Sequence, residues 1–226
     1  MFTDAQREQL RSGAAVWNLQ LDGPTIERFA QFADLLEDGN RRLNLTRVPP
    51  TEVATRHYLD SLALAAVLTP KPGSSLLDVG TGAGFPGLPL ALAFPQIHVT
   101  LMDGTRKRLE FLDEAIATLG LTNVTTLHGR AEETARLPAH RRRYDLVTAR
   151  AVAKMPKLVQ WLLPLVRTGG LAVAYKSLET DLEIQEADTA LQRMGGQLEQ
   201  VVEVALPGTE IVRKLVIMRG KGGGSL

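Results

Sequence analysis

A strand-like run followed by four closely spaced glycines is the feature that most restricts the fold of this chain. Residues 76–79 are apolar apart from Asp78, glycines occupy positions 80, 82, 84 and 87, and a helix-like segment follows at 88–94. Glycine permits positive φ, and without a Cβ the backbone can approach a ligand closely. The helix N-terminus behind the loop offers free N–H groups and a partial positive charge. The pattern predicts a ligand-binding loop at the start of a Rossmann-like α/β domain.

The rest of the C-terminal two thirds alternates strand-like and helix-like segments. The predicted strands are 76–79, 98–102, 124–128, 145–149, 171–175, 199–206 and 211–218, and the predicted helices are 88–94, 106–119, a short one near 132–135, 154–166 and 182–194. Such alternation predicts a seven-stranded, mostly parallel sheet with helices on both faces. Only residues 207–210 separate the last two strands, so these should form an antiparallel hairpin at the sheet edge.

The first 68 residues have helical periodicity instead. A turn at 22–24 precedes a helix that should stop at Gly39-Asn40, and a second helix should run from about Thr51 to Leu68. The proline-containing segment 69–73 ends it. We therefore predict an N-terminal helical segment (1–72), a main domain (73–219) and a flexible glycine-rich tail (220–226).

Composition excludes several classes of protein. The absence of cysteine excludes disulfides, thiolate metal sites and cysteine nucleophiles, and no metal site is expected. No apolar stretch is long enough to span a membrane and the N-terminus lacks a secretory signal, so we expect a cytoplasmic protein. The formal net charge of +1 argues against a strongly basic nucleic-acid binder. Local clusters at Arg41-Arg42, Arg47 and 141–143 leave RNA contacts open, although the last cluster alone is better explained as solvated surface.

Two cofactor classes fit the glycine loop. The spacing of Gly82, Gly84 and Gly87 matches the dinucleotide pattern GxGxxG, and Asp103 lies where a ribose-binding acid is expected. The spacing of Gly80, Gly82 and Gly84 equally matches the GxGxG loop of S-adenosylmethionine enzymes. The acid two residues before the first glycine, Asp78, would repel a pyrophosphate and attract the ammonium group of S-adenosylmethionine. This favours S-adenosylmethionine, with a loop-bonding acid as the alternative role for Asp78.

Further cofactor contacts are expected at the ends of the next two strands. Asp103 ends the second strand, ahead of Gly104 and Thr105, and its carboxylate can accept hydrogen bonds from both ribose hydroxyls. An N-cap for the helix near Arg106 is the alternative. Ala131 and Glu132 follow the third strand and should lie beside the adenine, although a simple helix start explains them equally well.

The absence of two catalytic signatures reduces the number of atoms that could accept the methyl group. Methylation of pyrimidine carbon 5 usually needs a cysteine nucleophile, and the chain has none. Methylation of exocyclic amino groups usually places Asn/Asp-Pro-Pro-Tyr/Phe after the fourth strand, where this chain has residues 148–153, Thr-Ala-Arg-Ala-Val-Ala. Ring nitrogens that already carry a lone pair remain, including nitrogen 7 of guanine; these need alignment and exclusion of water but no general base.

Several segments together resemble the bacterial small-subunit ribosomal RNA methyltransferase G family, also called the glucose-inhibited division protein B family. The matching segments are 44–46 (Asn-Leu-Thr), 56–61 (Arg-His-Tyr-Leu-Asp-Ser), 78–87, Lys107-Arg108 with Phe111-Leu112, Arg150-Ala151, and Arg213 with Leu215-Val216. They occur in order and span about residues 40 to 218. One departure is Lys176-Ser177, where the family usually has Lys-Gly, which puts the backbone after the fifth strand in doubt.

The resemblance implies methyl transfer from S-adenosylmethionine to nitrogen 7 of a guanosine in small-subunit (16S) ribosomal RNA, free or within an assembling subunit. It implies substrate positioning by Arg56, His57 and Arg213. With the loop analysis it gives the expected cofactor set of Asp78, Gly80, Gly82, Gly84, Phe85, Asp103, Gly104, Thr105, Ala131, Glu132 and Arg150.

Simpler explanations remain for three of these side chains. Arg56 and Asp60, four residues apart, could form an ordinary surface pair, and His57 alone would more often be a core or surface histidine than a catalyst. Arg213 could be a solubility charge on an edge strand instead of a contact to RNA phosphate. At the level of function, two alternatives stay open: a dinucleotide-dependent oxidoreductase, and a non-catalytic RNA-binding assembly factor on a methyltransferase scaffold.

Overall fold

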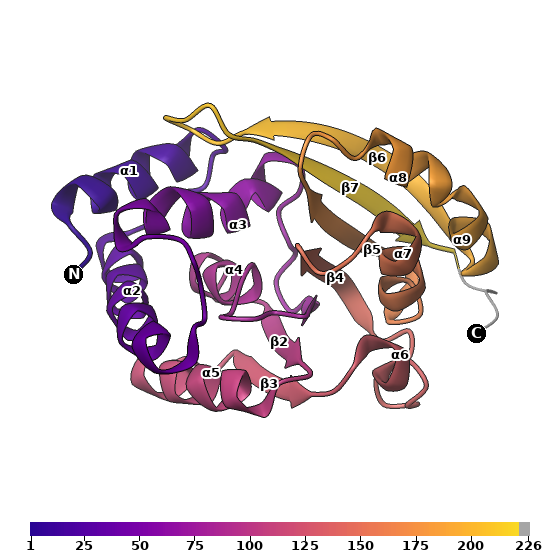
Figure 1. The fold of residues 1–226 in the computed structure, drawn as a ribbon, viewed down its shortest axis with the longest axis horizontal. Helices are drawn as coiled ribbons and strands as arrows, with labels where there is room; N and C mark the ends of the chain where they lie inside the picture. The colour runs from indigo at the N-terminus through magenta and orange to yellow at the C-terminus, as the bar shows by residue number, and fades with distance from the viewer. Residues whose placement is uncertain (222–226) are drawn as a thin grey trace.

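The structure, a computed structural model, describes residues 1–221 and contains one seven-stranded sheet (Figure 1). The strands are β1 (Ser75–Val79), β2 (His98–Asp103), β3 (Val124–His128), β4 (Tyr144–Arg150), β5 (Val166–Lys176), β6 (Gly196–Ala205) and β7 (Val212–Gly220). Their order is β3-β2-β1-β4-β5-β7-β6. The first five strands run parallel, and β7 pairs antiparallel with both β5 and β6. The predicted mixed sheet with a C-terminal hairpin is confirmed.

Both faces of the central strands β1 and β4 are buried, which explains their apolar runs. Alternation along β1 sends Leu76 into one core cluster and Leu77 and Val79 into the other. Helices α4 (Gly87–Ala93) and α5 (Arg106–Thr118) cover the first face. Helices α6 (Ala131–Thr134), α7 (Met155–Leu162), α8 (Asp181–Glu186) and α9 (Asp188–Arg193) cover the second (Figure 1).

The N-terminal helices α1 (Asp4–Ala15) and α2 (Gly23–Leu43) pack over the first face and share its core. Helix α2 passes the predicted stop at Gly39 and ends at Leu43, where Asn44 takes a left-handed conformation. A Cβ on Gly39 would lie 2.7 Å from the Phe111 ring, so this glycine serves close packing of α2 against α5 instead of ending the helix.

The prediction of a single regular helix over 51–68 is wrong, although the segment is helical. The segment consists of a 3₁₀ turn (Pro50–Glu52), a π-helical turn (Ala54–Leu59), one α-turn, α3 (Asp60–Leu62), and a second 3₁₀ turn (Ala63–Ala66). Tertiary bonds accompany the irregularity: the Tyr58 hydroxyl donates to the Phe29 carbonyl, and Asp60 faces arginines of β4 and β7. Wider π turns of this kind are frequent at functional sites.

Smaller differences concern the C-terminal half. Helix α7 ends at Leu162 because β5 begins at Val166, earlier than predicted. The predicted helix 182–194 divides at Ala187 into α8 and α9. Strand β7 includes Gly220, and residues 222–226 of the predicted tail lie outside the described residues. Among residues 1–221, no helix combines the length and apolarity required to cross a membrane.

Candidate active site

The glycine loop joins β1 to α4 at the carboxyl edge of the sheet. Gly82 has a φ of +60°, and a Cβ built there would meet no atom within 4 Å. Gly87 has the opposite surroundings, because its Cβ would lie 2.4 Å from the Leu101 side chain. The loop therefore uses glycine for two purposes: an open backbone face at 82 and close packing at 87.

Asp78 braces this loop from beneath. Its carboxylate is fully buried and accepts hydrogen bonds from the Thr81 hydroxyl (2.6 Å), the Thr148 hydroxyl (2.9 Å) and the Gly87 backbone N–H (2.9 Å). Burial raises the pKa of Asp78, and the three hydrogen bonds oppose that rise. The carboxylate lines none of the cavities described below, and its three bonds fit the alternative role of a loop-bonding acid; its contact to a cofactor ammonium group stays a prediction.

Asp103 lies beside the loop and borders a cavity of about 320 Å³. Its carboxylate accepts from the backbone N–H groups of Gly82 (3.0 Å) and Thr105 (2.8 Å), and Arg108 lies 3.4 Å away. The cavity is lined by six predicted cofactor residues, Gly80, Asp103, Gly104, Thr105, Ala131 and Glu132. Val152 and Trp161, which the sequence did not single out, line it as well.

Besides Asp78, four other predicted cofactor residues do not line this cavity, and Gly82 is tied to it through its N–H bond to Asp103. Gly84 is packed against Leu112, and Phe85 is buried against the His57 ring, with ring centroids 4.1 Å apart and planes within 5°. The Arg150 guanidinium lies over the Phe85 ring, with its Cζ 5.1 Å from the ring centroid. Phe85 and Arg150 thus join the glycine loop to a second site.

That second site is a cavity of about 850 Å³ lined by Arg56, His57, Asp60, Arg150 and Arg213, among others. Asp60 is its anchor. It is 2% exposed, accepts from Arg213 Nε (2.6 Å) and Nη2 (2.9 Å), and accepts from Arg150 Nη1 (2.8 Å). The bidentate pair fixes the guanidinium plane of Arg213. Of the Arg213 nitrogens, Nη1 makes no bond within residues 1–221.

These contacts test the simpler explanations that the sequence left open for Arg56 and Arg213. Arg56 pairs with Glu52 (2.8 Å), one turn earlier, and not with Asp60, whose side chain is held by arginines of β4 and β7. The predicted alternative of an Arg56–Asp60 surface pair is therefore wrong. So is the edge-charge explanation for Arg213, because β7 lies between β5 and β6.

His57 is buried and fully bonded. Arg150 Nη2 lies 3.2 Å from His57 Nδ1, and since a guanidinium only donates, Nδ1 is the acceptor. The hydrogen then resides on Nε2, which donates to Thr46 Oγ1 (2.8 Å). Burial, followed by the charges of Arg150 and Arg56, lowers the pKa of His57 from 6.5 to about 3. His57 is a neutral positioning group.

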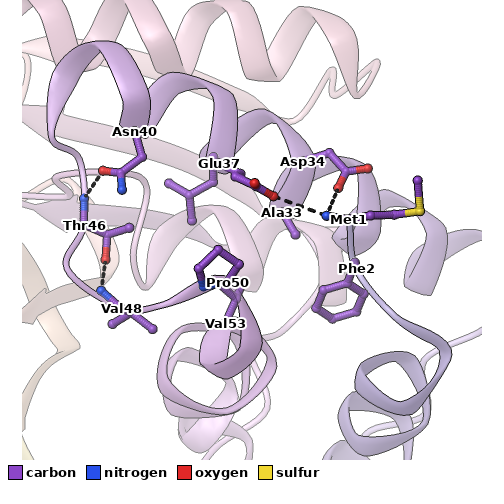
Figure 2. Close-up of a pocket in the computed structure, with 11 residues that line it drawn as sticks. Met1, Phe2, Ala33, Asp34, Glu37, Asn40, Thr46, Val48, Pro50 and Val53 are labelled. Carbon is purple, nitrogen blue, oxygen red and sulfur yellow. Dashed lines mark hydrogen bonds and ion pairs between the residues drawn. The ribbon is translucent and has the colours of Figure 1, made fainter.

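Figure 2 shows the surroundings of Thr46, whose hydroxyl accepts from His57. A cavity of about 40 Å³, too small for a cofactor, separates α2 from residues 46–53. Across it Asn40 Oδ1 accepts from the Thr46 N–H (2.8 Å), and Thr46 Oγ1 accepts from the Val48 N–H (3.0 Å). These bonds orient the hydroxyl that faces His57.

Sequence reasoning did not include among the site residues several side chains that line the second cavity or hold its lining residues in place. Thr46 and Asp60 stand inside the segments that carry the family resemblance, which was the available signal. Lys176 bonds Glu183 (2.7 Å), and no sequence pattern pointed to Glu183. No group of three or more His, Cys, Asp or Glu residues suited to a metal ion occurs within residues 1–221.

Comparison with known proteins identifies relatives over nearly the whole chain. Residues 25–212 match the sequence model of a family described as rRNA small subunit methyltransferase G. The ribosomal RNA small subunit methyltransferase G of Roseiflexus castenholzii is 44% identical over 213 residues, covering 94% of this chain and 91% of that protein. The protein of the same name from Lachnoclostridium phytofermentans is 43% identical over 202 residues, covering 89% and 84%.

Solved structures share the fold at low sequence identity. A SAM-dependent methyltransferase from Aquifex aeolicus superposes with a TM-score of 0.56 at 20% identity, covering 76% of this chain and 94% of that one. Precorrin-6y C5,15-methyltransferase from Geobacter metallireducens gives a TM-score of 0.51 at 16% identity, covering 71% and 86%. The Rossmann-like methyltransferase fold is confirmed.

Proposed function

This chain belongs to the rRNA small subunit methyltransferase G family, and on that premise we propose that it methylates nitrogen 7 of a guanosine in small-subunit ribosomal RNA, using S-adenosylmethionine. The observation that carries the proposal is the pair of cavities at the carboxyl edge of the sheet. They meet at the loop after β4, where Ala151 lines one cavity and Val152 the other. Ligands of doubly wound sheets bind at this edge.

The residues of the smaller cavity, together with Gly82, whose N–H donates to Asp103, fit the nucleoside part of S-adenosylmethionine. Gly82 presents open backbone, Asp103 places a carboxylate beside it, and Ala131 and Glu132 begin α6 without a side-chain cap. We assign cofactor binding to Gly80, Gly82, Asp103, Gly104, Thr105, Ala131 and Glu132, and an indirect, loop-bracing role to Asp78, Gly84 and Phe85. When bound, S-adenosylmethionine supplies a methyl group on a cationic sulfur that is open to attack by a lone pair.

The larger cavity suits a nucleophile that needs no deprotonation. Both nitrogens of His57 are engaged, and both oxygens of Asp60 are occupied by arginines. Neither is poised as a general base. Nitrogen 7 of guanine already carries its lone pair, so the task left to the protein is alignment and exclusion of water.

Arginines of the larger cavity are the proposed contacts to RNA. Asp60 holds Arg213 so that Nη1 remains for a phosphate or a guanine acceptor. Arg56, half exposed at the rim, is the second candidate, and Arg150 positions the site through His57 and Phe85. The N-terminal segment 1–72 supplies Arg56 and His57, which supports its proposed role as cap and RNA contact. The cytoplasm stays the predicted location.

The test separates cofactor binding from methyl transfer. Calorimetry should detect S-adenosylmethionine binding, and transfer should be measured on naked small-subunit RNA and on assembled subunits. Arg213→Ala should spare cofactor affinity and reduce transfer at least about tenfold, the loss expected when one charged contact is removed. Binding of a nicotinamide cofactor instead would favour the oxidoreductase alternative. Cofactor binding without transfer to either RNA substrate would favour the assembly factor.

A further inference from the structure

A further hollow lies beyond the cofactor cavity, among the helices of the second face. Its volume is about 310 Å³, at the lower end of the range for ligand pockets. Helix α7 lies next to both α6 and α9 (Figure 1), and the hollow is lined by Arg136, Gln160, Trp161 and Arg193, together with Glu132, Ala135 and Met194.

The charges around this hollow are uncompensated. The guanidinium groups of Arg136 and Arg193 are on exposed residues and make no ion pair or hydrogen bond within residues 1–221. Some exposed arginines elsewhere are paired, Arg41 with Glu37 and Arg167 with Asp145, whereas Arg28, Arg47, Arg106 and Arg130 make no side-chain ion pair or hydrogen bond within residues 1–221 either; what sets Arg136 and Arg193 apart is that both line one hollow. Glu132 is the single acid of the lining, so the hollow has a surplus of positive charge.

An aromatic side chain connects the hollow to the cofactor cavity. Trp161 is partly exposed and lines both spaces, and Lys157 Nζ lies 4.8 Å from its ring centroid. A partly exposed indole beside cations is the combination with which proteins bind single-stranded nucleic acid, the ring stacking on a base and the cations contacting phosphates.

We propose that the hollow formed by α6, α7 and α9, called here the Trp161 groove, binds a single-stranded segment of the substrate RNA that flanks the target guanosine. A base stacks on Trp161, and Arg136, Arg193 and Lys157 contact the adjoining phosphates. The proposal rests on the proposed function, because it assigns a second contact to the same RNA. It is distinct from cofactor binding, since Arg136, Gln160 and Arg193 do not line the cofactor cavity.

RNA affinity of charge-neutral variants tests the cations. Arg136→Gln and Arg193→Gln are compared with Lys71→Gln, which removes one exposed charge at the opposite, amino edge of the sheet. Binding of a labelled single-stranded oligoribonucleotide of about 12 nucleotides and of the small-subunit RNA is followed by anisotropy, with S-adenosylhomocysteine in the cofactor cavity. Each groove variant should weaken binding at least about threefold and lower the slope of log affinity against log salt by about 0.7. Lys71→Gln should change neither.

Stacking is tested by fluorescence. The chain has two tryptophans, so a Trp17→Phe background reports Trp161 alone. RNA should quench this emission after S-adenosylhomocysteine is already bound. Unchanged emission, groove variants that bind RNA like Lys71→Gln, or an equal loss of cofactor affinity would each overturn the groove. If wild-type protein binds RNA in this way but transfers no methyl group, the proposed function fails and the groove stands.

Discussion

Replacement of His57 by asparagine should remove a specific part of the pH dependence of stability. The folded pKa of His57 is about 3, against 6.5 for an ordinary histidine. Because the folded pKa is depressed, the stabilisation is complete above pH 6.5 and declines as the pH falls from 6.5 toward 3. At pH 5 the unfolded histidine is protonated and the folded one is not. The interval of 1.5 pH units then corresponds to about 2 kcal/mol, at 1.36 kcal/mol per unit.

Urea denaturation at pH 8 and pH 5 measures this directly. The asparagine side-chain oxygen can still accept from Arg150, as Nδ1 does, so the variant keeps the acceptor and loses the titrating group. The wild type should lose about 2 kcal/mol more than His57→Asn between the two pH values, since all other titrating groups are shared. Parallel losses would show that His57 is not buried in its neutral form, and would refute the assignment of Nδ1 as the acceptor for Arg150.

The other predictions use the same unfolding and calorimetric assays. Asp60→Asn should destabilise the fold by about 2–4 kcal/mol, because the mostly buried guanidinium groups of Arg150 and Arg213 lose their counter-charge; a change below about 0.5 kcal/mol would mean the arginines are solvated without it. Asp78→Ala should lower the free energy of unfolding by about 2–4 kcal/mol, because three buried donors lose their acceptor. It should also weaken cofactor binding, because the glycine loop loses its support. Weaker cofactor binding with unchanged stability would instead indicate direct contact between Asp78 and the cofactor. Gly82→Ala should weaken cofactor binding about tenfold or more at a strain of about 1 kcal/mol. Gly208→Ala, equally strained at φ +74° and equally open, is the matched control. An equal effect of the two variants on cofactor affinity would contradict the assignment of Gly82 to cofactor binding.

The architecture was predictable because its signals are local. The central strands contain short apolar runs, and the four-residue link at 207–210 leaves room only for a hairpin. The segment 51–68 was not predictable in detail, since helical periodicity does not record that Asp60 meets arginines 90 and 153 residues away in the chain. Tertiary contacts overrode local propensity there.

Some residues of the candidate site were likewise predictable from local sequence, and others were not. Gly80, Asp103 and Ala131 follow strand ends, and the parallel topology brings such positions to one edge. The charge of Asp78 predicted a contact to the cofactor, with a loop-bonding acid as the alternative, and which of the two the side chain can reach depends on the side of the sheet that it faces. Asp78 stands opposite Thr148 in the register and points into the core beneath α4, which the sequence could not reveal without the strand order.

One measurement tests the central claim most directly. The protein is incubated with small-subunit RNA, naked or assembled, and S-adenosylmethionine carrying a trideuterated methyl group, and the RNA is digested and sequenced by mass spectrometry. The two adjoining cavities predict one labelled nucleotide, a guanosine bearing the heavy methyl on nitrogen 7, and greatly reduced labelling with Arg213→Ala. Label on an exocyclic amino group, a ribose or a pyrimidine carbon would contradict the account, and so would unlabelled RNA from protein that has bound the cofactor.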